Sequence, residues 1–438
     1  MTAQSTAPLV LIAVPILTAL FGLFMWRSLQ PLKIWLLIAS VVSLGTIVWA
    51  AGALPAHSGG VFLLSLLPVM AFVTLLGQPL HAGNAPAWLL TLLLTGLGFG
   101  ALASATAVSL VCFLLLLAVV GLILFHYRAR SGSDAWWGIG TLGLGVISVG
   151  VALIGVPSVS VVAFTVACAV AFPLVPFHKG YTSALTGLPG NLPSFLALLL
   201  PVIGFHGLTA VLPLSQDALT EAVGVLALLG TLYGSLKALV QSRAASVVAY
   251  GSLAFLSILW WALVIMRDAG PQTVVYLSAV SLATSGLLIA WYMLRARYGE
   301  IGLRALSGLA EPMPRFAIAV SLLAFAAIGL PPFGVFSGFM GLLLAPTFTW
   351  TGGLIVIIIA WLSASWYLFD LVQGLLFGRC QTERRHEDLG EAELTSLAIV
   401  LVLLVALGVM PTRLFDVKGH EPGTDQRTAV MEFRAWNK

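Results

Sequence analysis

The stretch Gly329-Leu-Pro-Pro-Phe-Gly-Val-Phe-Ser-Gly-Phe339 interrupts an apolar run that extends from Ala317 to Pro346. About 20 apolar residues cross the hydrocarbon core of a bilayer as a helix, and this run has about 30. Two adjacent prolines and several glycines define the break, namely Gly329, Pro331, Pro332, Gly334 and Gly338. These residue types remove helical hydrogen bonds and free carbonyl groups that lipid cannot satisfy. The break therefore predicts either an ion or substrate path or a plain kink that lets two helices pack closely.

The composition of the whole chain is that of a helical membrane protein. Of the 438 residues, 60% are hydrophobic and only 8% are charged, and the mean hydropathy is +1.06. A soluble domain has about 25% charged residues. The basic pI of about 9.1 reflects few acids. Basic loops are expected from membrane topology, so we expect a lipid bilayer and no nucleic acid as a partner. The three cysteines lack metal-ligand spacing, and no cofactor motif is present.

Uncharged runs predict about fourteen transmembrane helices, of which the broken run is the twelfth. The predicted ranges are 8–26, 33–53, 60–77, 86–104, 106–126, 136–156, 158–177, 192–213, 219–240, 246–266, 272–294, 316–345, 352–377 and 394–410. We also expect the tryptophan pairs Trp136-Trp137 and Trp260-Trp261, which lie near helix ends, to anchor the chain at the membrane interface.

Basic residues gather in alternate connections. The odd-numbered connections contain Arg27, Lys33, Arg128, Arg130, Lys179, Arg243, Arg295, Arg297, Arg304, Arg315, Arg379, Arg384 and Arg385. The even-numbered ones contain only Arg267, which is followed by Asp268. Because cytoplasmic loops are rich in Lys and Arg, this bias places both termini outside, in a bacterial-type inner membrane.

Several motifs between residues 170 and 380 occur together and in order. They are Phe172-Pro-Leu-Val-Pro-Phe-His178, Leu232-Tyr-Gly-Ser-Leu-Lys-Ala-Leu-Val-Gln241, Ala249-Tyr-Gly-Ser252, Gly308-Leu-Ala-Glu-Pro-Met-Pro314, Gly329-Leu-Pro-Pro-Phe-Gly334 and Tyr367-Leu-Phe-Asp370. In the order and spacing of these motifs, the chain resembles the antiporter-like membrane subunits of respiratory complex I, a family shared with Mrp-type cation/proton antiporters and membrane-bound hydrogenases.

The resemblance implies an all-α polytopic fold with two inverted five-helix repeats and broken seventh and twelfth helices. It divides the chain into N-terminal transmembrane helices (1–105), a first repeat region (106–266), a second repeat region (267–410) and a short polar tail (411–438). Partners implied by the family are other membrane subunits and a soluble or peripheral protein.

In the family, protons pass along buried charges, namely a glutamate on the fifth helix, lysines or a histidine on the seventh and eighth, and a lysine or glutamate on the twelfth. The corresponding helix 106–126 contains no acid. The seventh-helix position is Ala171, the eighth-helix position falls at 201–203, and the twelfth-helix position is Gly338. An intramembrane charge is costly and is kept only where it has a role. The resemblance therefore implies that the usual relay is lost.

Four ionisable residues remain as candidates for a rerouted ion path, and each has a structural alternative. Asp370 interrupts an apolar helix, where a structural pairing with a neighbouring chain is the other interpretation. The alternative for Lys237 is that its long side chain reaches the membrane interface and takes no part in an ion path. The alternative for His178 and His206 is that each is a hydrogen-bonded histidine of the core.

Three hypotheses follow for the function. The first is a structural subunit that anchors a partner in a complex of the complex I, hydrogenase or inorganic-carbon uptake type and is not catalytic alone. The second is an active proton or cation transporter with a rerouted path through Asp370, His206, His178 and Lys237. The third, a quinone- or lipid-associated redox subunit, has little support because no cofactor ligands are visible.

Overall fold

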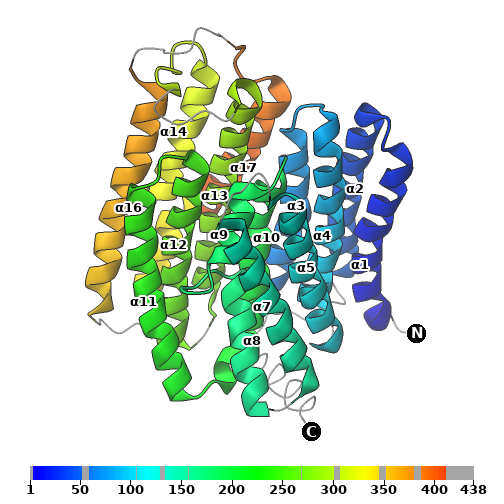
Figure 1. The fold of residues 1–438 in the computed structure, drawn as a ribbon, viewed down its shortest axis with the longest axis vertical. Helices are drawn as coiled ribbons and strands as arrows, with labels where there is room; N and C mark the ends of the chain where they lie inside the picture. The colour runs from blue at the N-terminus through cyan, green and yellow to red at the C-terminus, as the bar shows by residue number, and fades with distance from the viewer. Residues whose placement is uncertain are drawn as a thin grey trace.

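The computed structural model describes residues 3–51, 59–104, 106–128, 134–155, 157–267, 269–299, 306–344, 352–378 and 386–410. The predicted tail at 411–438 lies outside these residues, as do Arg130, Asp268, Arg304, Arg379, Arg384 and Arg385. The described part is entirely helical and forms an upright bundle (Figure 1).

The helices up to residue 214 follow the predicted spans closely, apart from α9. They are α1 (Ala3–Gly22), α2 (Leu29–Ala50), α3 (Gly60–Leu76), α4 (Ala85–Ala103), α5 (Thr106–His126), α7 (Asp134–Ile154), α8 (Pro157–Ala171), α9 (Lys179–Gly187) and α10 (Leu192–Val211), with short 3-10 helices at Leu23–Met25, Ala82–Asn84 and Leu212–Leu214. The predicted seventh helix, 158–177, corresponds to α8, which ends at Ala171, and the prediction missed the short helix α9 that follows the break.

The helices after residue 214 complete the bundle. They are α11 (Asp217–Leu239), α12 (Ala244–Met266), α13 (Pro271–Tyr298), α14 (Pro314–Ile328), α15 (Gly334–Leu343) and α16 (Gly353–Leu376), followed by α17 (Glu391–Val409). The broken twelfth helix is the pair α14 and α15. Eleven of the described helices are long and apolar enough to span a membrane. The 17-residue α3 and the two broken helices complete the fourteen predicted crossings.

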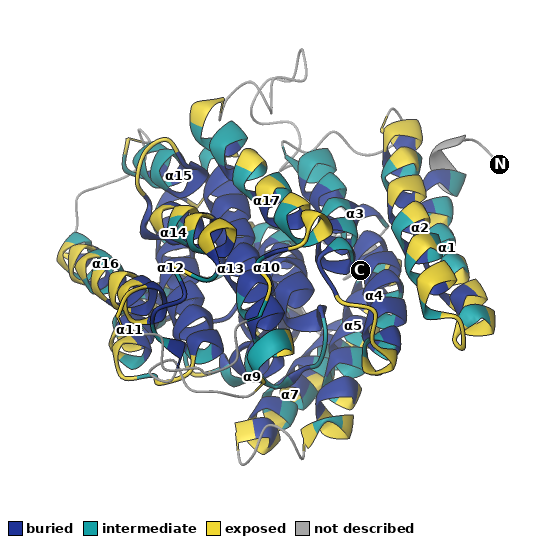
Figure 2. Cartoon of the chain, turned by 90° about the horizontal axis from the view of Figure 1, so that it is seen from above, coloured by how far each residue is buried: buried dark blue, intermediate teal, exposed yellow. Residues whose placement is uncertain are grey.

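Residues are mostly buried at the centre of the bundle and more exposed at its rim (Figure 2). In α13 the most apolar 18 residues are entirely buried, because α10, α12, α14, α15 and α17 surround it. The rim helices α1, α2, α7, α11 and α16 instead show apolar side chains on their outer faces. Because a bilayer is the natural solvent for such faces, this arrangement agrees with a multi-pass membrane protein.

One end of the bundle, which we call the basic end, carries the N-terminus of α2 and the C-termini of α3 and α13. Lys33 donates hydrogen bonds from Nζ to the carbonyl oxygens of Leu76 (3.1 Å) and Gln78 (2.5 Å) at the C-terminus of α3. A cation at the C-terminus complements the helix dipole and satisfies carbonyls that have no helical partner.

A carboxylate cluster at the same end joins α13, α14 and α17. The guanidinium of Arg297 donates to Glu393 from Nη1 to Oε1 (2.9 Å) and from Nη2 to Oε2 (2.5 Å). Asp388 accepts hydrogen bonds from the backbone N–H groups of Arg315 (2.7 Å) and Phe316 (3.2 Å) and so caps α14. These bonds fix the start of the broken twelfth helix relative to the buried α13.

We expect Arg297→Ala to lower the free energy of unfolding by about 2 kcal/mol, because it leaves a mostly buried Glu393 without its bidentate partner. Thermal unfolding in detergent measures this effect. The exposed Arg315, whose side chain is not part of the cluster, supplies the control Arg315→Ala. Equal losses for the two variants would contradict the role given to the Arg297–Glu393 pair.

Candidate functional site

The break in the twelfth helix is closed by backbone packing. Gly329 ends α14 in the left-handed region (φ +83°), and its N–H donates back to Phe325 and Ala326. Gly408 of α17 lies directly against the carbonyl of Pro332, so closely that a Cβ at this position would overlap the Pro332 oxygen. Ser337 at the start of α15 donates from Oγ to the carbonyl of Leu407 (3.0 Å). Helix α17 therefore packs directly on this break.

Gly338, at the predicted relay position of the twelfth helix, is buried against the backbone of α13. A Cβ at Gly338 would lie 2.7 Å from Cα and 2.8 Å from N of Tyr276. Tyr276 cannot move away easily, because it is fully buried and its hydroxyl donates to the carbonyl of Phe255 (3.2 Å). The site accepts a glycine and has no room for a longer side chain.

The break in the seventh helix is closed by an aromatic pair. Helix α8 ends at Ala171, which is fully buried, and the next carbonyl, that of Phe172, accepts a hydrogen bond from Nε1 of Trp260 (3.0 Å). The two rings stack at 5.1 Å and 15°. Trp260 is thus part of the core, and so is Trp261 at 4% exposure. The expectation that this pair anchors the membrane interface is wrong, because the indole is needed where the helix breaks.

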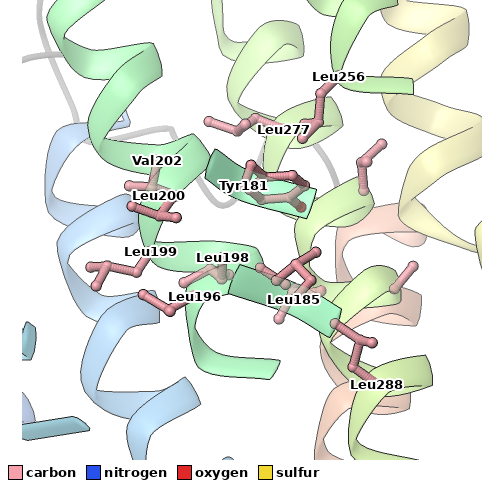
Figure 3. Close-up of a cluster of buried hydrophobic side chains, with 14 of the residues drawn as sticks. Tyr181, Leu185, Leu196, Leu198, Leu199, Leu200, Val202, Leu256, Leu277 and Leu288 are labelled. Carbon is pink, nitrogen blue, oxygen red and sulfur yellow. The ribbon is translucent and has the colours of Figure 1, made fainter. Parts of the chain in front are cut away.

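The eighth-helix position at 201–203 lies in an apolar cluster (Figure 3). Leu198 and Val202 of α10 belong to this cluster with Tyr181 and Leu185 of α9, and all four are fully buried. Helix α10 also approaches the seventh-helix break closely, since a Cβ at Gly204 would lie 2.5 Å from the backbone N of Phe172. Within the described residues, the three predicted relay positions on the seventh, eighth and twelfth helices are all packed by uncharged groups.

The structure does not bring the four candidate ion-path residues together into one charged cluster. Asp370 is exposed on the outer face of α16, and Lys237 is half-buried close to the end of α11. His206 is half-buried on α10, whereas His178 is buried at the start of α9. Among the described residues, no ion pair joins any two of the four.

A polar cluster around α9 contains a residue that sequence reasoning missed. Lys179 donates from Nζ to the hydroxyl of Tyr250 on α12 (3.1 Å). The ring of His178 lies 5.2 Å from that of Tyr233 and 6.2 Å from that of Tyr250. Lys179 was expected in a loop, but it is the first residue of α9, and its half-buried side chain contacts α12. A lysine directly after a proline-broken helix was the available signal.

Chemically, the Lys179 cluster offers one ammonium group and two phenols. Such groups can hold a proton, but within the part of the chain described here no carboxylate is hydrogen-bonded to them. The same residues contain no group of three or more His, Cys, Asp or Glu side chains that could hold a metal ion.

Comparison with known proteins gives a consistent picture. The family model described as NADH:quinone oxidoreductase/Mrp antiporter, TM, matches residues 91–366. NADH-quinone oxidoreductase subunit N 2 of Aquifex aeolicus is 29% identical over 259 residues, which cover 57% of this chain and 53% of the relative. Subunit M of Pseudomonas aeruginosa is 27% identical over 310 residues, or 69% of this chain and 59% of the relative. The chain thus spans little more than half the length of these curated relatives.

Two solved structures share the fold over nearly the whole chain. A chain of respiratory complex I from Thermus thermophilus with bound NADH has a TM-score of 0.75 and 19% identity, and the match covers 98% of this chain and 100% of that one. A chain of an archaeal membrane-bound sulfane sulfur reductase has a TM-score of 0.79 and 18% identity, covering 98% and 99%.

We expect Gly338→Ala to destabilise the protein by about 1–3 kcal/mol, because the added methyl group would press on the backbone of Tyr276. Gly140→Ala is the matched control, since a Cβ at Gly140 meets nothing within 4 Å and alanine favours a helix. Chemical or thermal unfolding in detergent compares the two. A neutral Gly338→Ala would show that α15 and α13 are not packed as described.

We expect Trp260→Phe to cost about 1–3 kcal/mol, because it leaves the buried carbonyl of Phe172 without a donor. The control is Trp137→Phe, at a tryptophan that is 71% exposed on α7. Equal stability of both variants would mean that the helix break does not depend on the indole bond.

Proposed function

The chain belongs to the NADH:quinone oxidoreductase/Mrp antiporter transmembrane family, and from that premise we propose that it is an antiporter-like membrane subunit that anchors a larger complex without running a proton relay. The anchoring role is not catalytic by itself and needs no cofactor in this chain.

The packing around Gly338 is the observation that carries this proposal. A proton relay needs a titratable side chain near the break, and the backbone of Tyr276 occupies the space that such a side chain would need. Ala171 is likewise enclosed, and the carbonyl that follows it is satisfied by Trp260. Without a titratable side chain at these positions, the barrier to a proton across these breaks is several kcal/mol higher than in a charged path.

The partners proposed for the chain follow from its relatives. Those relatives are named as subunits of NADH-quinone oxidoreductase, and the solved chains come from respiratory membrane complexes. We infer other membrane subunits and a soluble or peripheral protein as partners. Complexes of the complex I, hydrogenase and inorganic-carbon uptake types all fit this plan.

The orientation proposed for the chain puts the basic end in the cytoplasm and both termini outside, in a bacterial-type inner membrane. Lys33, Arg243 and Arg297 lie at or near this end, which supports the assignment because cytoplasmic ends of transmembrane helices are enriched in Lys and Arg.

A second candidate function, proton or cation transport by a rerouted path, is favoured by one observation. The half-buried Lys179 donates a hydrogen bond to Tyr250, beside His178. This pair would be a starting point for such a path if it were continued by water to His206, Lys237 or Asp370.

A proton-flux measurement in proteoliposomes separates the two functions. We expect the purified chain to show no flux above that of empty vesicles under an imposed potential, and Lys179→Ala, His206→Ala and Asp370→Asn to match the parent. A protonophore added at the end confirms that the vesicles hold a gradient. Flux that is abolished by any of these three substitutions would contradict the anchoring function and establish the transport function.

A further inference from the structure

The outer face of α16 is apolar except for the carboxylate of Asp370 and the amide of Gln373, which is exposed one turn later. The exposed side chains before Gln373 form a single stripe that we call the α16 stripe, made of Ile355, Ile359, Leu362, Trp366, Phe369 and Asp370. Both views of the molecule place α16 at the rim of the bundle (Figures 1 and 2). The stripe therefore faces whatever surrounds the chain in the membrane.

Asp370 is unsuited to a lipid-facing position. It lies six residues before the end of α16 at Leu376, which is about 9 Å along the helix axis. A short aspartate side chain cannot reach the interface from there as a lysine could. No described residue forms a hydrogen bond or ion pair with its carboxylate, although α11, α12 and α14 all pack on α16. Intramembrane carboxylates are costly in lipid and are found facing a partner.

Comparison with α10 shows which face of α16 lacks a neighbour. Helix α10 packs on α4 and α8, and it is also covered by α13 and α3, so that 83% of its most apolar 18 residues are buried. Helix α16 packs on α11, α12 and α14, and only 39% of its most apolar 18 residues are buried, because no further helix of the described chain covers its outer face. This comparison favours a covering helix that lies outside the described chain.

We propose that the α16 stripe binds a transmembrane helix of a second membrane subunit, and that this helix presents an Arg or Lys to Asp370. The proposal rests on the proposed function, because it assigns the surface through which the chain joins its complex. A cation at this depth converts the unpaired carboxylate into an ion pair shielded from water, where charge pairing is strong.

A second copy of this chain is a poor occupant of the α16 stripe. In a symmetric pair with both chains in the same membrane orientation, the two copies of Asp370 would lie at the same depth on the shared contact, and like charges repel there. Helix α16 has no Lys or Arg that could compensate. The partner helix is therefore a different one.

Photo-crosslinking in native membranes tests the proposal. A benzophenone amino acid replaces Trp366, which is 72% exposed on α16, and in a separate variant it replaces Ile147, which is 64% exposed on α7 and serves as the control position. We expect position 366 to yield one crosslinked membrane protein whose reactive helix contains Lys or Arg. That crosslink falls at least about tenfold with Asp370→Lys, whereas the control position is unchanged.

Two further variants keep the test decisive. Asp370→Leu removes the charge without adding another, and we expect it also to weaken the crosslink, because it leaves the partner's cation unpaired in the membrane. Changing that Lys or Arg to Asp should restore the crosslink in the Asp370→Lys chain. Unchanged crosslinking in Asp370→Leu and Asp370→Lys would overturn the proposed ion pair.

The outcomes separate this inference from the proposed function. If the chain co-purifies with other subunits but position 366 reaches only lipid or a second copy of the chain, the α16 interface is wrong and the anchoring function stands. If the chain purifies alone from native membranes, the anchoring function fails, and the α16 interface fails with it.

Discussion

In a bilayer, every backbone carbonyl that a broken helix frees has to find its partner within the protein. This constraint shapes both interrupted helices. At the seventh-helix break the indole of Trp260 bonds the carbonyl of Phe172, and at the twelfth-helix break α17 packs through Gly408 onto Pro332. Both solutions use uncharged groups and contact at van der Waals distance. The hinge geometry is therefore held by packing, and no charge is needed to stabilise it.

The same packing explains how charges are distributed over the molecule. Where the breaks are filled by Phe172, Trp260 and Tyr276, a charged side chain would have to displace a core aromatic residue. The well-defined ion pair of the described core region, Arg297 with Glu393, lies at the basic end and connects helix termini. Asp370 lies at the rim. The chain thus has its structural charges at its ends and outer face, which suits a subunit that is held by neighbours.

The sequence was sufficient to predict the membrane-spanning helices, because a long uncharged apolar run in a membrane protein forms a helix that crosses the bilayer. Apart from the short helix α9, which no predicted span covers, the predicted spans agree with the structure to within a few residues, and the Pro-Pro break appears where the prolines predict it. The remaining features depend on tertiary contacts. The burial of Trp260, the bond of Lys179 to Tyr250 and the contact of Gly338 with Tyr276 each involve a helix far away in the chain. Periodicity could place Asp370 on a helix, but only the packing of α11, α12 and α14 shows that its face is uncovered.

The central claim, that both helix breaks are closed by packing, can be tested by electron cryomicroscopy of the chain in its native complex at a resolution that shows ordered water. The account predicts direct contact between Gly338 and the backbone of Tyr276 and the indole bond from Trp260 to Phe172. It also predicts no water between α8 and α10 at the seventh-helix break or between α13, α15 and α17 at the twelfth-helix break. A continuous file of ordered water molecules through either break, reaching a titratable side chain, would contradict it.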